Sequence, residues 1–96
     1  MPTYVVLYKF TDQGLKDIKG TVHRARDVRA DLEKRGFNVI GIYWTQGQYD
    51  VVSIVDAPSE DAMVAGLFNV AVAGNVHSET LRAHSEAEME RAFQAG

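Results

Sequence analysis

Runs of apolar residues divide the chain into segments of two kinds. Three segments, residues 4–10, 37–44 and 49–55, are dense in β-branched and aromatic side chains and are bounded by turn-forming residues, which predicts β-strands. Residues 76–83 predict a fourth, more polar strand, as is typical of the edge of a sheet. A short link between the second and third strands predicts a hairpin, in which we expect Gly47 to adopt a positive φ angle.

Other segments predict helices. Within residues 21–35, and again within 57–74, apolar side chains recur at helical spacing and share one face of a helix. A capping box at residues 85–88 predicts a short helix at the end of the chain. We expect residues 14–20, which begin and end with glycine, to form an irregular turn. The side chains expected to face the sheet are Val22, Ala25, Val28 and Leu32 on the first helix, and Met63, Leu67, Val70 and Ala71 on the second.

The predicted elements follow the order βαββαβ, with one further helix after the last strand. Two β-α-β units joined through a hairpin form an α+β, ferredoxin-like sandwich, in which a four-stranded antiparallel sheet carries two helices on one face. In this topology the first and third strands lie in the centre of the sheet. A chain of 96 residues is near the usual size of one core, so we expect a single domain over residues 1–96.

Both faces of the predicted sheet are apolar. In the first strand Tyr4, Val6 and Tyr8 point to one face, Val5 and Leu7 point to the other, and the next two strands repeat this double pattern. Two helices cover one face only, so we expect an identical sheet from another subunit to cover the second, burying residues such as Tyr4, Val6 or Tyr8 in a homodimer or higher homo-oligomer. The alternative is that the last helix folds back over the open face, although it offers little apolar area.

Composition narrows the range of partners. The chain has 10 Lys and Arg against 13 Asp and Glu, a net charge of −3, and no basic stripe, so we expect no nucleic-acid binding. The absence of cysteine excludes disulfides and thiolate chemistry. No apolar run approaches the ~20 residues that cross a bilayer, and we expect a cytoplasmic protein that neither contacts a membrane nor needs a cofactor.

The histidines do not predict a metal site. His77 and His84 lie in and just after the fourth strand, and their separation of seven positions directs them to opposite faces of a regular strand. We therefore expect no bound metal. The polar fourth strand fits the edge of the sheet and equally suits the mouth of a pocket, with His77, Glu79 and Arg82 as the side chains available there.

The polar residues most open to a functional interpretation lie at the hairpin. Asp50 adjoins an otherwise apolar strand, where partial burial would raise the pKa of its carboxyl group and suit it to accept a proton. A structural interpretation competes: Asp50 accepts hydrogen bonds from turn amides and holds the hairpin, while Tyr49 closes the end of the core. We favour the structural role. The candidate binding residues, placed around a small pocket near the hairpin, are Tyr43, Tyr49, Asp50 and His77.

Residues 43–52, YWTQGQYDVV, resemble the signature of the GYD-domain family, which is named after its Gly, Tyr and Asp. In this chain the three signature residues are Gly47, Tyr49 and Asp50. The resemblance implies a small bacterial or archaeal protein of ferredoxin-like, dimeric α+β-barrel type, without an established activity. It covers nearly the whole chain, because residues 10–14, 57–58 and 74–83 fit the same family.

Three functions of different classes are compatible with these features, one of them a purely structural assembly subunit. The one we favour is a homo-oligomeric small-ligand-binding or accessory module. The alternative is a cofactor-independent small enzyme, of oxygenase or isomerase type, that uses Asp50 or His77 as its base. Fold by itself does not choose between these functions, and the sequence leaves open whether the chain is an enzyme.

Overall fold

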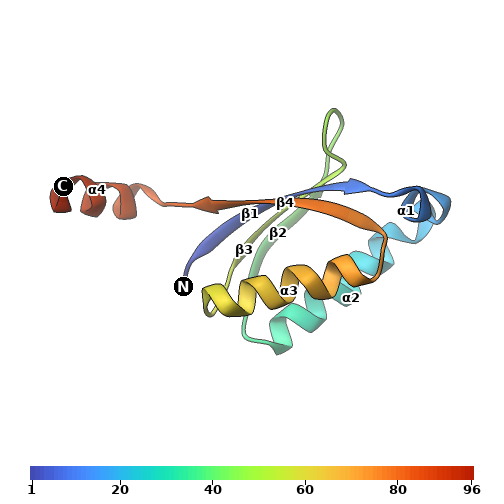
Figure 1. Ribbon diagram of the computed structural model, residues 1–96, viewed down its shortest axis with the longest axis horizontal. Coiled ribbons are helices and arrows are strands. Elements are labelled where there is room, and N and C mark those ends of the chain that lie inside the picture. Colours follow the sequence, from blue (N-terminus) through green and yellow to red (C-terminus); the bar gives the residue numbers. More distant parts are fainter.

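A computed structural model describes residues 1–96 and shows a four-stranded antiparallel sheet with the strand order β2-β3-β1-β4 (Figure 1). The fold is α+β and ferredoxin-like, and strands one and three lie in the centre as the sequence predicts. None of the helices combines the length and apolar character that crossing a membrane requires. The elements in chain order are β1 (Thr3–Phe10), α1 (Asp12–Lys16), the 3₁₀-helix η1 (Ile18–Gly20), α2 (Thr21–Lys34), β2 (Asn38–Trp44), β3 (Val51–Asp56), α3 (Glu60–Val72), β4 (Val76–Ala83) and α4 (Glu86–Ala95).

Two segments differ from the sequence prediction. The expected irregular turn after β1 is instead the short helix α1 followed by η1, because Thr11 caps α1: its Oγ1 accepts a hydrogen bond from the Gly14 N–H at 3.1 Å. Strand β3 begins at Val51 rather than at residue 49. The Thr45 N–H donates to the Asp50 carbonyl at 2.8 Å and closes the hairpin loop. Tyr49 and Asp50 therefore belong to the loop, and the pairing of β2 with β3 begins after them.

The core lies between the sheet and helices α2 and α3. Tyr4 and Val6 of β1 lie on the same face as Val55 of β3, since Tyr4 pairs with Val55 in the antiparallel register. The expectation that Tyr4, Val6 or Tyr8 would be buried between subunits is wrong. Alternation assigns residues to two faces but does not say which face the helices cover, and here they cover the face of Tyr4 and Val6. The buried core consists of Tyr4, Val6, Phe37, Val55, Ala57 and Met63.

The opposite face of the sheet carries no helix. Figure 1 shows α2 and α3 on one side only, while α4 continues away from the end of β4 instead of folding back over the open face. The first turn of α4 is held to β4 by an ion pair between Arg82 and Glu88, 3.7 Å apart. Hydrogen bonding to Ser85 and the nearby Arg82 guanidinium lower the pKa of Glu88. The register places on the open face Val5 and Leu7 of β1, Val52 and Ile54 of β3, Tyr43 of β2 and Leu81 of β4.

The hairpin turn depends on Gly47, whose φ angle is +117° as the sequence predicts. A side chain added there would meet no atom within 4 Å, so any cost of substitution comes from the backbone alone. We expect Gly47→Val to lower the free energy of unfolding by about 1–2 kcal/mol. Urea denaturation followed by circular dichroism measures the change, with Gln46→Val in the same exposed loop as the control. Equal loss in both variants would show that the φ angle is not the cause.

Candidate functional site

A cavity of about 370 Å³ separates the two helices above the centre of the sheet. Helix α2 packs against the edge strand β2 and α3 packs against the opposite edge strand β4, so the space over β1 and β3 is only partly filled. The lining is mainly apolar. Its aliphatic and aromatic side chains include Phe10, Val28, Leu32, Val39, Ile42, Trp44, Val51, Val55, Val70 and Val76.

Two hydroxyl groups meet at the floor of this cavity. Tyr8 of β1 and Ser53 of β3 both line it, and the Tyr8 hydroxyl lies 3.2 Å from Ser53 Oγ, where either group donates. Ser53 is only 4% exposed, and burial raises the pKa of the Tyr8 hydroxyl, so this tyrosine remains protonated at neutral pH. The pair therefore offers neutral hydrogen bonding in an otherwise apolar space.

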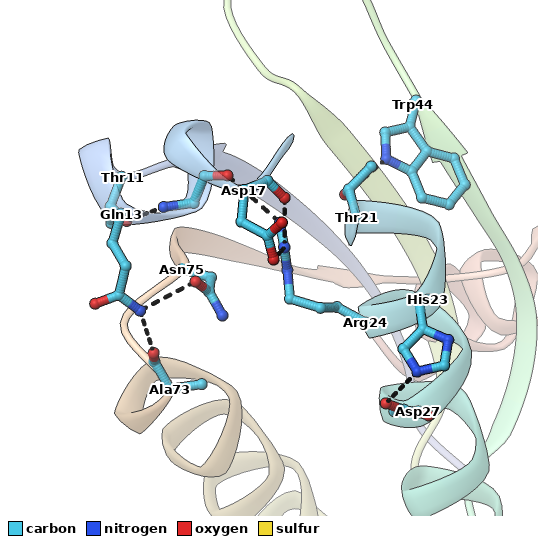
Figure 2. Close-up of polar contacts among 11 residues, drawn as sticks. Thr11, Gln13, Asp17, Thr21, His23, Arg24, Asp27, Trp44, Ala73 and Asn75 are labelled. Atoms are coloured by element: carbon cyan, nitrogen blue, oxygen red, sulfur yellow. Dashed lines mark hydrogen bonds and ion pairs between the residues drawn. The ribbon is translucent and has the colours of Figure 1, made fainter. Parts of the chain in front are cut away.

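Polar contacts join α2 to Asp17, which lies between α1 and η1, and to strand β2 (Figure 2). The Arg24 guanidinium, which lines the cavity, donates to the Asp17 carbonyl at 2.7 Å and to the Asp17 carboxylate at 3.0 Å. The Trp44 indole N–H donates to Thr21 Oγ1 at 3.1 Å and thereby ties strand β2 to the start of α2. These contacts hold three side chains that line the cavity, Thr21, Arg24 and Trp44, in place.

Asp50 lies at the end of β1 rather than in the cavity. Its carboxylate accepts a hydrogen bond from the Phe10 N–H at 2.9 Å, and its own N–H donates to the Tyr8 carbonyl at 2.8 Å. The residue thus satisfies backbone groups of a strand that is 40 positions away in sequence. This geometry supports the structural interpretation of Asp50.

The other predicted binding residues lie on the open side of the sheet. The Tyr49 hydroxyl donates to the Glu79 carboxylate at 2.5 Å, and this hydrogen bond raises the pKa of Tyr49. Tyr43 lies at the β2 edge with its ring against Gly41, and His77 lies on β4 opposite Lys9.

The structure therefore joins Tyr49 and Asp50 at the hairpin but does not bring Tyr43 and His77 together, since β3 and β1 separate their strands. None of Tyr43, Tyr49, Asp50 and His77 lines the cavity. Sequence reasoning missed Tyr8 and Ser53 as site residues. Each carries a hydroxyl group at a position of a central strand that faces the helices, and this feature could have identified them. It is easily overlooked because the neighbouring residues of both strands are apolar.

The role of Asp50 is testable by truncation. Asp50→Ala leaves the Phe10 N–H without its partner, and we expect the free energy of unfolding to fall by about 1–3 kcal/mol. Asp50→Asn keeps an amide oxygen at the same place and is expected to recover at least half of that loss. Chemical denaturation of the two variants beside the unmodified chain measures both values. Full stability of Asp50→Ala would contradict the structural role.

The fold and the cavity define a small ferredoxin-like α+β protein with a partly open pocket between its sheet and helices. The family model described as GYD domain matches residues 4–93, and the chain belongs to this family. The chain is also similar to a protein of Thermus thermophilus named glutamine synthetase and cystathionine beta-lyase binding protein. The two are 31% identical over 90 residues, which cover 93% of this chain and 95% of the relative.

Proposed function

We propose that this protein is a homo-oligomeric accessory module of the cytoplasm that binds partner proteins and a small molecule and carries out no chemistry itself. The observation that carries the proposal is that apolar side chains are exposed on two separate surfaces. One is the open face of the sheet, where Tyr43 and Leu81 are exposed and Val5, Leu7, Val52 and Ile54 are half-buried. The other is the outer side of α3. Contiguous apolar surface of this kind marks interaction sites in proteins of this size.

The open sheet face suits a second copy of the chain. On the two central strands its middle positions are Val5, Leu7, Val52 and Ile54, and the charged side chains of these strands lie at the ends: Lys9 at one end of β1, and Asp56 opposite Thr3 at the other. Glu79 of the edge strand β4 lies opposite Leu7, where its carboxylate accepts from the Tyr49 hydroxyl. Suppose that the two sheets pack face to face and are related by a two-fold axis that lies between them and runs perpendicular to the strands. The Lys9 end of each sheet then lies over the Asp56 end of its partner. Charge and apolar area are then complementary in a single arrangement.

The outer side of α3 suits a different partner. Val64, Phe68 and Val72 follow one another at intervals of four residues, so they form a stripe on one side of the helix, which we call the α3 stripe. They are 52%, 68% and 85% exposed, respectively. None of them lines the cavity. This stripe would remain free when two sheets pack face to face.

The similarity to the Thermus thermophilus protein suggests which partners to test first. That relative is named for binding a glutamine synthetase and a cystathionine beta-lyase. We propose that enzymes of these two kinds are also partners of this chain, with the α3 stripe as the contact surface.

The alternative, a cofactor-independent oxygenase or isomerase, is predicted to use Asp50 or His77 as its base and would need that residue beside the cavity. Asp50 and His77 lie elsewhere: the Asp50 carboxylate accepts from the Phe10 N–H, and His77 lies on the open side of β4. The accessory role is therefore better supported by the positions of these residues.

The proposal is tested by two measurements on the purified chain. Size-exclusion chromatography with multi-angle light scattering should give the mass of a dimer or a multiple of it. Biolayer interferometry should detect saturable binding to the glutamine synthetase or cystathionine beta-lyase of the same organism. A stable monomer at micromolar concentration that binds neither enzyme would refute the proposal.

A further inference from the structure

We infer that the cavity between α2 and α3 binds a small, uncharged, mainly apolar molecule that carries one hydrogen-bond acceptor oxygen, of the size and type of an aryl ketone. This inference deepens the binding role proposed above and rests on it. It names the site and the ligand class, neither of which follows from the assembly or from partner enzymes. Its test measures ligand binding directly, separately from the oligomeric state.

The size and lining of the cavity determine the first property of the ligand, which must be small and mainly apolar. A volume of about 370 Å³ equals that of roughly a dozen liquid water molecules at ~30 Å³ each. It lies at the lower end of the range of small-molecule pockets, ~300–1,000 Å³. The walls are aliphatic and aromatic, with Phe10 and Trp44 among them, so an apolar guest gains contacts there that water does not. A molecule built on a single ring fits both requirements.

The hydroxyl pair at the floor of the cavity determines the second property of the ligand, a single hydrogen-bond acceptor. Tyr8 and Ser53 together possess two O–H groups, and the hydrogen bond between them uses one. The second O–H is available to a third partner, and because both residues line the cavity, that partner is best supplied from inside it. A neutral pair of this kind donates to a carbonyl or ether oxygen. The raised pKa of Tyr8 keeps its proton in place for this role.

The charged residues of the lining determine the third property of the ligand, the absence of charge. Arg24 is the cation among the lining residues, and the Asp17 carboxylate already holds it at 3.0 Å. Two further lining residues, Asp27 and Asp31, are acidic. An anionic ligand would therefore lose its hydration and meet carboxylates without gaining a free cation, which is unfavourable. The site selects uncharged molecules over carboxylates.

The experiment uses three matched probes with the full chain. Acetophenone carries the carbonyl oxygen, α-methylstyrene replaces that oxygen with a methylene group at nearly the same shape, and benzoate carries a charge. Backbone amide NMR titrations follow shifts at residues of the cavity wall. We expect saturable acetophenone binding at this wall, and benzoate binding weaker by at least about tenfold.

Two sets of variants locate the site and its polar contact. The double variant Tyr8→Phe/Ser53→Ala removes both hydroxyls, so that neither replaces the other. It should weaken acetophenone by about three- to tenfold, the usual worth of one hydrogen bond, and change α-methylstyrene by less than about twofold. Val70→Trp fills the cavity and should abolish binding of both uncharged probes. Val72→Trp, on the exposed side of the same helix, is the matched control and should leave binding unchanged.

The double variant decides the matter if Val70→Trp fails to fold, because removing both partners of a hydrogen bond is nearly neutral for stability. The inference is overturned if acetophenone produces no saturable shifts at the cavity wall, if benzoate binds as well as the ketone, or if the double variant weakens ketone and hydrocarbon equally. A dimer that binds partner enzymes but not acetophenone would refute this inference and leave the accessory function standing.

Discussion

Replacing Gly14 with alanine is expected to lower the free energy of unfolding by about 2–4 kcal/mol, the combined worth of three hydrogen bonds. A Cβ atom at this buried glycine would lie 2.2 Å from the Asn75 carbonyl oxygen, which is backbone and has no rotamer with which to move away. Helix α1 must then shift from the entry to β4. That shift breaks the bonds from the Thr11 N–H to the Asn75 carbonyl (3.0 Å), from the Thr11 hydroxyl to the Gly74 carbonyl (2.6 Å) and from the Gln13 amide to the Ala73 carbonyl (2.9 Å).

Gly66→Ala is the matched control for this prediction. The added Cβ at Gly66 would lie 3.5 Å from the side chains of Leu32 and Phe37, an ordinary contact distance. Since Gly66 is inside α3, alanine there should raise stability by about 0.5–1 kcal/mol. Chemical denaturation should therefore show opposite signs for the two substitutions. A Gly14→Ala variant as stable as the unmodified chain would show that α1 does not need this close approach.

Ile54→Lys is expected to convert the proposed homodimer into monomers, raising its dissociation constant by at least about a thousandfold. Ile54 lies on the open face at a central position, opposite Val5 of β1. In a two-fold interface the substitution enters twice, and each buried unpaired ammonium costs at least about 2 kcal/mol, or some 4 kcal/mol in total. Within a single subunit the lysine head reaches water, so the fold should survive. Light scattering across a dilution series measures the mass.

Phe68→Lys supplies the reciprocal control. It introduces the same charge on the α3 stripe, where it should leave the mass unchanged and remove binding to the proposed partner enzyme. Ile54→Lys should not act directly on the α3 stripe, so any loss of enzyme binding in that variant reflects loss of avidity alone. If Ile54→Lys keeps the mass of the unmodified protein and Phe68→Lys becomes monomeric, the subunits meet through α3 and the proposed assignment of the two surfaces is reversed.

The order and type of the elements were predictable because they depend on neighbours in sequence. The alternation around Tyr4 and Val5, the helical spacing through Val28 and Leu32, and the cap of Ser85 and Glu88 each involve residues within a few positions of one another. The strand order then followed from the short connections of the β-α-β units. The turn at Gly47 was predictable for the same reason, since a tight hairpin demands a residue that accepts positive φ.

The candidate site was much less predictable. The sequence places Tyr49 and Asp50 at the hairpin, but it does not show that the Asp50 carboxylate accepts the Phe10 N–H, nor that Tyr49 reaches Glu79 of β4. The prediction of which helical side chains face the sheet was also only partly correct. Val22 and Ala71 are exposed, while Val28, Leu32 and Val70 line the cavity. A helical stripe specifies which side chains share a face, not how closely that face approaches the sheet.

Apart from α1 and η1, the sequence by itself thus determined the elements and their order, together with the apolar character of both sheet faces and the family. Only the tertiary structure decided which face the helices cover, where α4 points, and that Tyr8 and Ser53, 45 positions apart, meet on the floor of a cavity. The physical reason is one of range. Periodicity and capping arise from interactions between residues close in sequence. The cavity, by contrast, results from α2 and α3 packing over opposite edge strands, and this arrangement depends on contacts between segments far apart in the sequence.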